Sequence, residues 1–133
     1  MSIGWLHPIL LHFPIGLVLP AAAAELVAIR TRRATWHAIA QANARAGAVG
    51  GVLAAIAGWA LATAPSIEPS PMLTWHRWTG SAGALAATVA ALLSLRARSV
   101  RWFQTALFAA AVLIALAGHL GGSLVWGPEI LGH

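Results

Sequence analysis

Four long apolar segments separated by short connections constrain the fold of this chain more than any other feature. They run from about residue 9 to 29, 38 to 64, 76 to 95 and 104 to 126. Each supplies about the 20 residues needed to cross a hydrocarbon core ~30 Å thick. Because lipid offers the backbone no hydrogen-bond partner, we expect each segment to be a helix. The sequence therefore predicts an all-α integral membrane protein whose residues 1–133 form a single transmembrane domain.

The connections are short, so successive helices should be antiparallel neighbours in a four-helix bundle. The chain is 59% hydrophobic and 8% charged, whereas a soluble domain usually carries about 25% charged residues. Cys, Lys and Asp are absent. Thiolate ligands, covalently attached haem and a Walker-type phosphate loop are thereby excluded. No motif supports nucleic-acid binding, despite the net charge of +5, and none marks the chain as an enzyme by itself.

Arginine placement orients the predicted bundle. Two clusters occupy the first and third connections, and by the positive-inside rule both connections are cytoplasmic. The termini and the proline-rich connection near residues 65–71 then lie on the outer, periplasmic side. We therefore expect a multi-pass protein of a bacterial inner membrane. The clustered residues are Arg30, Arg32, Arg33, Arg96, Arg98 and Arg101.

Four of the six histidines fall at the outer ends of the predicted helices. These are His7, His12, His76 and His119. The helical rise places His12 ~6 Å and His119 ~10 Å below the outer interface, so all four could share one layer. An ionisable side chain inside a membrane usually indicates a functional site. Imidazole holds haem iron axially and also suits Zn and Cu. The sequence favours b-type haem, with His12, His76 and His119 as the principal ligand or metal candidates and His7 as a secondary or alternative ligand.

Small residues accompany these histidines. Gly16 lies one turn beneath His12, Gly80 lies one turn beneath His76, and Gly122 is close to His119. Glycine beside an imidazole makes room either for a porphyrin or for a closely packed helix. The spacings His12-x-x-x-Gly16 and His76-x-x-x-Gly80 also suggest a parallel internal repeat, or a coincidence of shared topology.

A second constellation lies near the opposite end. Glu25 and Arg45 are expected at similar depths in neighbouring helices and could form a structural ion pair, or a proton or quinone site together with Gln41 and Asn43. His37 is expected to be a solvated surface residue.

The second predicted helix also carries a face of small residues. Gly47-x-x-x-Gly51 should allow close packing, either inside the bundle or against a second copy in a homodimer.

Two motifs carry a family resemblance. His7-Pro8-Ile9-Leu10-Leu11-His12-Phe13-Pro14-Ile15-Gly16 and His119-Leu120-Gly121-Gly122-Ser123-Leu124-Val125-Trp126-Gly127 resemble those of a bacterial family of predicted four-helix membrane proteins, domain of unknown function 2231. His76-Arg77 with Gly80 matches its middle motif, and the family usually has Tyr where Trp126 stands. Relatives are standalone inner-membrane proteins or are joined to c-type cytochromes or sugar dehydrogenases. The resemblance therefore implies electron transfer rather than transport.

These observations support three hypotheses. The first is a b-type-haem electron-transfer module that passes electrons between a periplasmic donor and the quinone pool or a partner subunit. The second is a Cu- or Zn-binding membrane protein. The third is a structural or assembly subunit without a cofactor, in which the histidines bond to backbone and to one another. In all three hypotheses, the protein is surrounded by the lipid bilayer.

Overall fold

The computed structural model describes residues 3–96 and 100–127, and all its regular elements are helical. Arg98, one of the clustered arginines, lies outside these residues. The helices, in chain order, are η1 (Ile3–Leu6), α1 (His7–Leu10), α2 (His12–Thr31), α3 (Ala34–Ala62), α4 (Pro71–Leu93) and α5 (Val100–Trp126).

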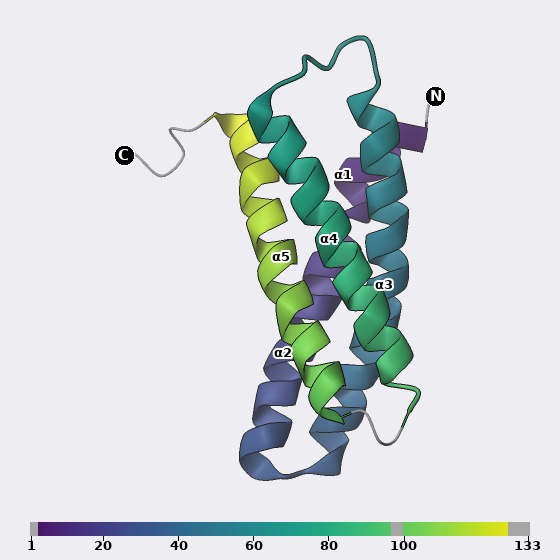
Figure 1. Ribbon diagram of the computed structural model, residues 1–133, viewed down its shortest axis with the longest axis vertical. Coiled ribbons are helices and arrows are strands. Elements are labelled where there is room, and N and C mark those ends of the chain that lie inside the picture. The colour runs from purple at the N-terminus through teal and green to yellow at the C-terminus, as the bar shows by residue number, and fades with distance from the viewer. Residues whose placement is uncertain (1–2, 97–99, 128–133) are drawn as a thin grey trace.

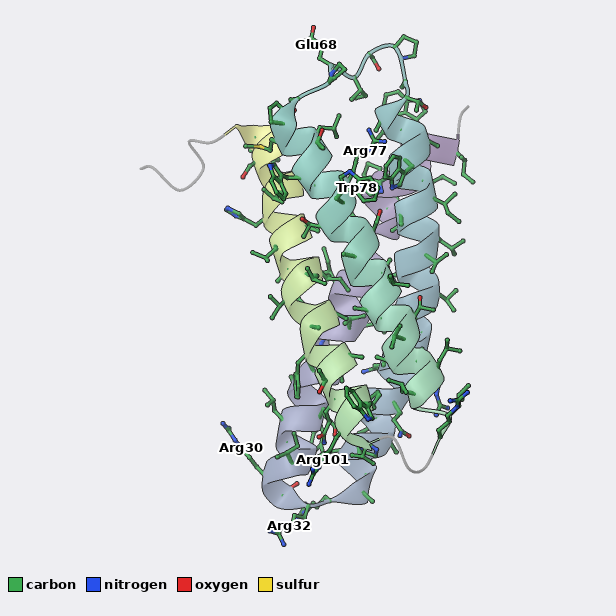
Figure 2. The ribbon with its side chains drawn as sticks, in the orientation of Figure 1. Arg30, Arg32, Glu68, Arg77, Trp78 and Arg101 are labelled. Carbon is green, nitrogen blue, oxygen red and sulfur yellow. The ribbon has the colours of Figure 1, made fainter. Side chains whose placement is uncertain are left out.

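The long helices α2, α3, α4 and α5 form the predicted four-helix bundle (Figure 1). α2 packs along α3, α3 along α4, and α4 along α5, whereas α2 and α5 share a smaller contact. The loop between α3 and α4 lies at the same end as η1 and the end of α5, and the turn between α2 and α3 lies at the other end (Figure 1). We call these the loop end and the arginine end. Figure 2 shows Glu68 and Arg77 at the loop end and Arg30, Arg32 and Arg101 at the arginine end.

Within the described residues, three helical stretches are long and apolar enough to cross a membrane by themselves. These are Ile3–Thr31, Ala34–Ala62 and Val100–Trp126. The 23 residues of α4 would reach across, at 1.5 Å per residue, but the first turns of this helix carry His76, Arg77 and Ser81. α4 is therefore the most polar of the four, and it is held in the bundle by its contacts with α3 and α5.

Local capping explains where the helices differ from the predicted ranges. α4 begins at Pro71, earlier than predicted, because the Ser70 hydroxyl accepts a hydrogen bond from the Leu73 N–H at 3.1 Å and Pro71 occupies the first helical turn. The first segment is interrupted at Leu11, between α1 and α2. Pro14 has no N–H to continue the hydrogen-bond ladder through this point.

Small residues fill the centre of the bundle. Most buried apolar residues are alanines, with Val18, Phe103, Leu107 and Ile114 as the larger members. A Cβ atom at Gly47 would lie 2.6 Å from Val18 Cγ2, and one at Gly50 would lie 2.6 Å from Phe13 Cβ. The glycines let α3 approach α2 closely. The small-residue face of α3 therefore packs within the bundle, which was the first of the two predicted alternatives.

Candidate functional site

Two histidines from opposite halves of the chain meet near the loop end. The ring centroids of His7 and His76 are 6.0 Å apart, and the rings are nearly perpendicular, at 82°. His7 Nδ1 donates to the carbonyl oxygen of Ala54 in α3 at 2.8 Å. His76 Nδ1 donates to the carbonyl oxygen of Ala117 in α5 at 2.9 Å. Both rings are only partly exposed.

These hydrogen bonds fix the chemical state of each ring. A carbonyl oxygen can only accept, so Nδ1 carries the proton in both histidines. In the neutral imidazole, Nε2 then keeps its lone pair and is the ligating or proton-accepting atom. Donation of the other ring nitrogen to a backbone carbonyl is the usual way in which proteins orient a metal-binding histidine.

Each ring also packs against a glycine one turn beyond its carbonyl partner. A Cβ atom at Gly58 would lie 2.9 Å from His7 Nδ1 and Cε1, and one at Gly121 would lie 2.9 Å from His76 Cε1. These distances are too short for any side chain, so both positions need glycine while the rings stay in place. Sequence reasoning did not connect Gly58 with His7 or Gly121 with His76.

The two histidine contacts share one spacing, which bears on the suggested internal repeat. His7 uses Ala54 and Gly58, and His76 uses Ala117 and Gly121, so each carbonyl partner is followed four residues later by the packing glycine. The repeat therefore matches His7, rather than the predicted His12, with His76.

The remaining two candidate histidines are placed elsewhere. His12 and His119 are both exposed. Ala117 and Gly121 face His76, and His119 lies two residues from each, which turns it to the other side of α5. Among the described residues, no three His, Cys, Asp or Glu side chains form a group that could hold a metal ion. The predicted set of His12, His76 and His119 is therefore not assembled.

The three glycines predicted to make room beside the histidines do have open surroundings. A Cβ atom at Gly16 or Gly122 would meet nothing within 4 Å, and one at Gly80 would meet only Ala117 Cβ at 3.8 Å. A Cβ atom at Gly118 of α5 would lie 3.7 Å from Ile15 Cδ1 of α2. The open glycines Gly16 and Gly122 thus belong to the two helices with the smaller mutual contact.

An arginine follows His76 directly. The guanidinium carbon of Arg77 lies 3.7 Å from the centroid of the Trp59 ring, and Trp59 meets Trp78 edge to face at 5.4 Å. Trp59 is held by a hydrogen bond from its Nε1 to Ser81 Oγ at 2.9 Å. Arg77 Nε is buried and lacks a hydrogen-bond partner within the described part of the chain. A desolvated donor next to His76 is suited to an anionic group.

A second polar cluster lies near the arginine end. Glu25 is 1% exposed. Its carboxylate accepts hydrogen bonds from His37 Nδ1 at 2.7 Å and from Gln104 Nε2 at 2.8 Å. Gln41 Nε2 donates to His37 Nε2 at 3.0 Å, and the edge of the His37 ring meets Phe103. The buried carboxylate is thus satisfied by α3 and α5 together.

This cluster corrects two predictions. Arg45 does not pair with Glu25: it donates through Nε to Ser94 Oγ at 2.7 Å and through Nη2 to the Ser94 carbonyl at 3.0 Å. His37 is not a solvated surface residue, because its side chain is 27% exposed and bound to Glu25. Glu25 and Ser94 are the two buried polar residues of the described chain. Glu25 lies 18 residues after His7, and Ser94 lies 18 residues after His76. The correspondence between the two halves therefore extends to the arginine end.

The fold and its two polar sites define an integral membrane helical bundle with paired inward histidines. A family profile described as a predicted membrane protein, DUF2231, matches residues 5–131. The chain belongs to this family, and the resemblance seen in the sequence is confirmed. No curated protein and no solved structure matches it significantly.

Proposed function

We propose that this protein is a membrane electron-transfer module that binds a b-type haem through His7 and His76. One observation carries the proposal: each ring donates its Nδ1 proton to a helix carbonyl, so each keeps a free Nε2 lone pair, and the two ring centroids lie 6.0 Å apart. Imidazole nitrogens are among the axial ligands that hold haem iron, and the 6.0 Å between the ring centroids brings two of them together from opposite halves of the chain.

The number of protein ligands favours haem over a bare ion. A structural Zn²⁺ site takes four protein ligands and a catalytic one takes three, whereas the described residues bring no group of three together. Cu(I) is selected by thiolate and thioether ligands, whereas the paired site is built from two imidazoles and the chain has no Cys. Haem iron needs only the axial positions from the protein. When bound, the haem would supply a one-electron couple.

The surroundings of the pair also fit a haem. Gly122 of α5 follows Gly121, which packs against His76, and a Cβ atom there would meet nothing within 4 Å. The Nε donor of Arg77, the residue after His76, has no hydrogen-bond partner among the described residues and could bind a haem propionate. With the arginine end in the cytoplasm, His7 and His76 lie toward the periplasm of a bacterial inner membrane. A periplasmic donor could then deliver electrons for the quinone pool or a partner subunit.

The proposal is tested by expressing the chain in a haem-replete host and measuring pyridine haemochrome spectra of purified protein. We expect a b-type spectrum in the wild type and its loss in His7→Ala and His76→Ala. His12→Ala and His119→Ala are the matched controls and should retain haem. A haem-free wild type would refute the function. Haem loss confined to the two control variants would refute the ligand assignment.

A structural role is the second candidate, because the same hydrogen bonds tie α1 to α3 and α4 to α5. In a cofactor-free assembly subunit, His7→Asn and His76→Asn could preserve a donor to the carbonyl and thereby stability. A haem-free wild type whose unfolding midpoint survives these two substitutions, but not His7→Ala and His76→Ala, would establish this alternative.

A further inference from the structure

A groove that is apolar along most of its length runs between α3 and α4 toward the arginine end. Its volume is about 320 Å³, and its walls include Val49, Val52 and Leu53 from α3 and Thr88, Ala91 and Leu92 from α4. Val49 and Leu92 are 63% and 60% exposed, so the groove opens on the outer surface of the bundle. In a membrane that surface faces acyl chains. Arg45 is the one charged residue in its wall.

A second cleft, which we call the polar cleft after one side of its lining, lies at the arginine end. Its volume is about 450 Å³. His37, Gln41, Ser94 and Arg96 form its polar side, and its apolar side is formed by Leu93, Leu95, Val100 and Phe103. The carboxylate of Glu25 is 1% exposed and is occupied by His37 and Gln104. The charged side chain in the wall is therefore the cation Arg96, and no acidic side chain lines the cleft.

Arg45 joins the two spaces. Its side chain is part of the apolar groove, and it donates to both the hydroxyl and the carbonyl of Ser94, which lies in the wall of the polar cleft. Gln41 lies one turn before Arg45 on α3, and Leu92 lies two residues before Ser94 on α4. Cleft and groove are thus linked by the Arg45–Ser94 contact, and we call the two together the amphipathic depression: Arg45 and Arg96 lie at the arginine end, and the apolar groove lies toward the bundle's middle.

We propose that this depression binds an anionic phospholipid. The phosphate would lie at Arg45 and Arg96, with His37 and Gln41 as further polar neighbours, and one acyl chain would follow the apolar groove. Basic pockets between transmembrane helices on the cytoplasmic side are suited to anionic headgroups. Charge complementarity selects an anionic head over a neutral one, and the adjoining groove selects a lipid over a free phosphate. The inference does not depend on haem.

Native mass spectrometry of the detergent-solubilised full chain tests the proposal, with phosphatidylglycerol and phosphatidylethanolamine added in equal amounts. We expect the wild type to retain phosphatidylglycerol preferentially. Arg45→Gln and Arg96→Gln should each lower its retention about fivefold, since one surface arginine contributes roughly that factor. Arg30→Gln is the matched control: it removes the same charge from the same end, but the side chain points away from the bundle (Figure 2), and retention should not change.

Two further measurements distinguish the contribution of the lipid headgroup to binding from that of the acyl chain. Ala91→Leu adds bulk to the apolar wall and should also reduce retention, whereas soluble glycerol phosphate should not displace the bound lipid. If Arg45→Gln unfolds because the bonds to Ser94 are lost, the phosphatidylglycerol retention of Arg96→Gln tests the proposal instead. Equal retention of both lipids, equal losses in Arg45→Gln, Arg96→Gln and Arg30→Gln, displacement by glycerol phosphate, or a quinone bound in place of phospholipid would each overturn the proposal.

Discussion

Gly58 and Gly121 set the positions of the two inward imidazoles. Each sits one helical turn beyond the carbonyl that its histidine binds, and each leaves less than 3 Å for an added Cβ atom. The ring cannot move away without stretching its own hydrogen bond. The requirement for glycine therefore comes from contact with a side chain, because both positions have ordinary helical backbone.

We expect Gly58→Ala and Gly121→Ala to destabilise the protein. Overpacking lowers stability by ~1–3 kcal/mol. The higher helix propensity of alanine offsets up to ~1 kcal/mol of that loss. Gly16→Ala and Gly122→Ala are matched controls, since their Cβ atoms would meet nothing within 4 Å. Denaturant unfolding in detergent should rank both controls at or above the wild type and both test variants below them. Equal stability of all four variants would contradict the tight packing of the rings.

Glu25 should be the most sensitive acidic residue. Glu25→Ala leaves the His37 and Gln104 donors without their acceptor, and each donor left unsatisfied in a buried site costs ~1–3 kcal/mol. Glu25→Gln keeps an oxygen acceptor and should cost less. The measurement is the free energy of unfolding, with Glu68→Ala in the exposed loop as control. A loss after Glu25→Ala no larger than that control would show that the cluster is dispensable.

Residue-level geometry could be predicted only in part. Four histidines at one end followed from the sequence, but the pair that meets did not. His7 and His12 are five residues apart, which in a continuous helix separates them by about 140° around the axis. They therefore could not have faced one partner together. The Ala-x-x-x-Gly spacing at Ala54 and Ala117 is the signal that could have identified His7 and His76, but such spacings are common in alanine-rich helices.

At the element scale, the helices were predicted well and their rotations were not. Large side chains such as Leu53, Ile56 and Leu85 face outward, whereas the buried positions are mainly alanine and glycine. Both faces are apolar, so periodicity gives little information about which face turns inward. This is why Arg45 could be placed near the depth of Glu25 and still point to Ser94 instead.

The start of α4 depends on one cap, which gives a prediction for this element. Ser70→Ala removes the acceptor for the Leu73 N–H and should cost ~1 kcal/mol of stability. Ser66→Ala in the same loop is the control, since Ser66 is exposed and precedes the helix. Denaturation of both variants in the same detergent provides the comparison. If both variants unfold alike, the cap contributes nothing.

At the scale of the whole molecule, the two ends differ in charge, and this asymmetry predicts orientation. The chain has no Cys, so single cysteines can be introduced without background. With the arginine end in the cytoplasm, Ser66→Cys should react with a membrane-impermeant maleimide in intact spheroplasts. Thr35→Cys should react only after lysis. The reverse labelling pattern would invert the topology and would place the paired histidines toward the cytoplasm.

The repeated use of one histidine, one carbonyl and one glycine in each half has a historical consequence. Two halves that run parallel across a membrane and meet through equivalent residues are what duplication and fusion of a shorter gene would leave behind. The ancestral product would have carried two helices and one such histidine, and it would have become functional only as a pair of identical chains. Fusion would then release the two halves to diverge, and at the arginine end they do differ: one half has Glu25 where the other has Ser94.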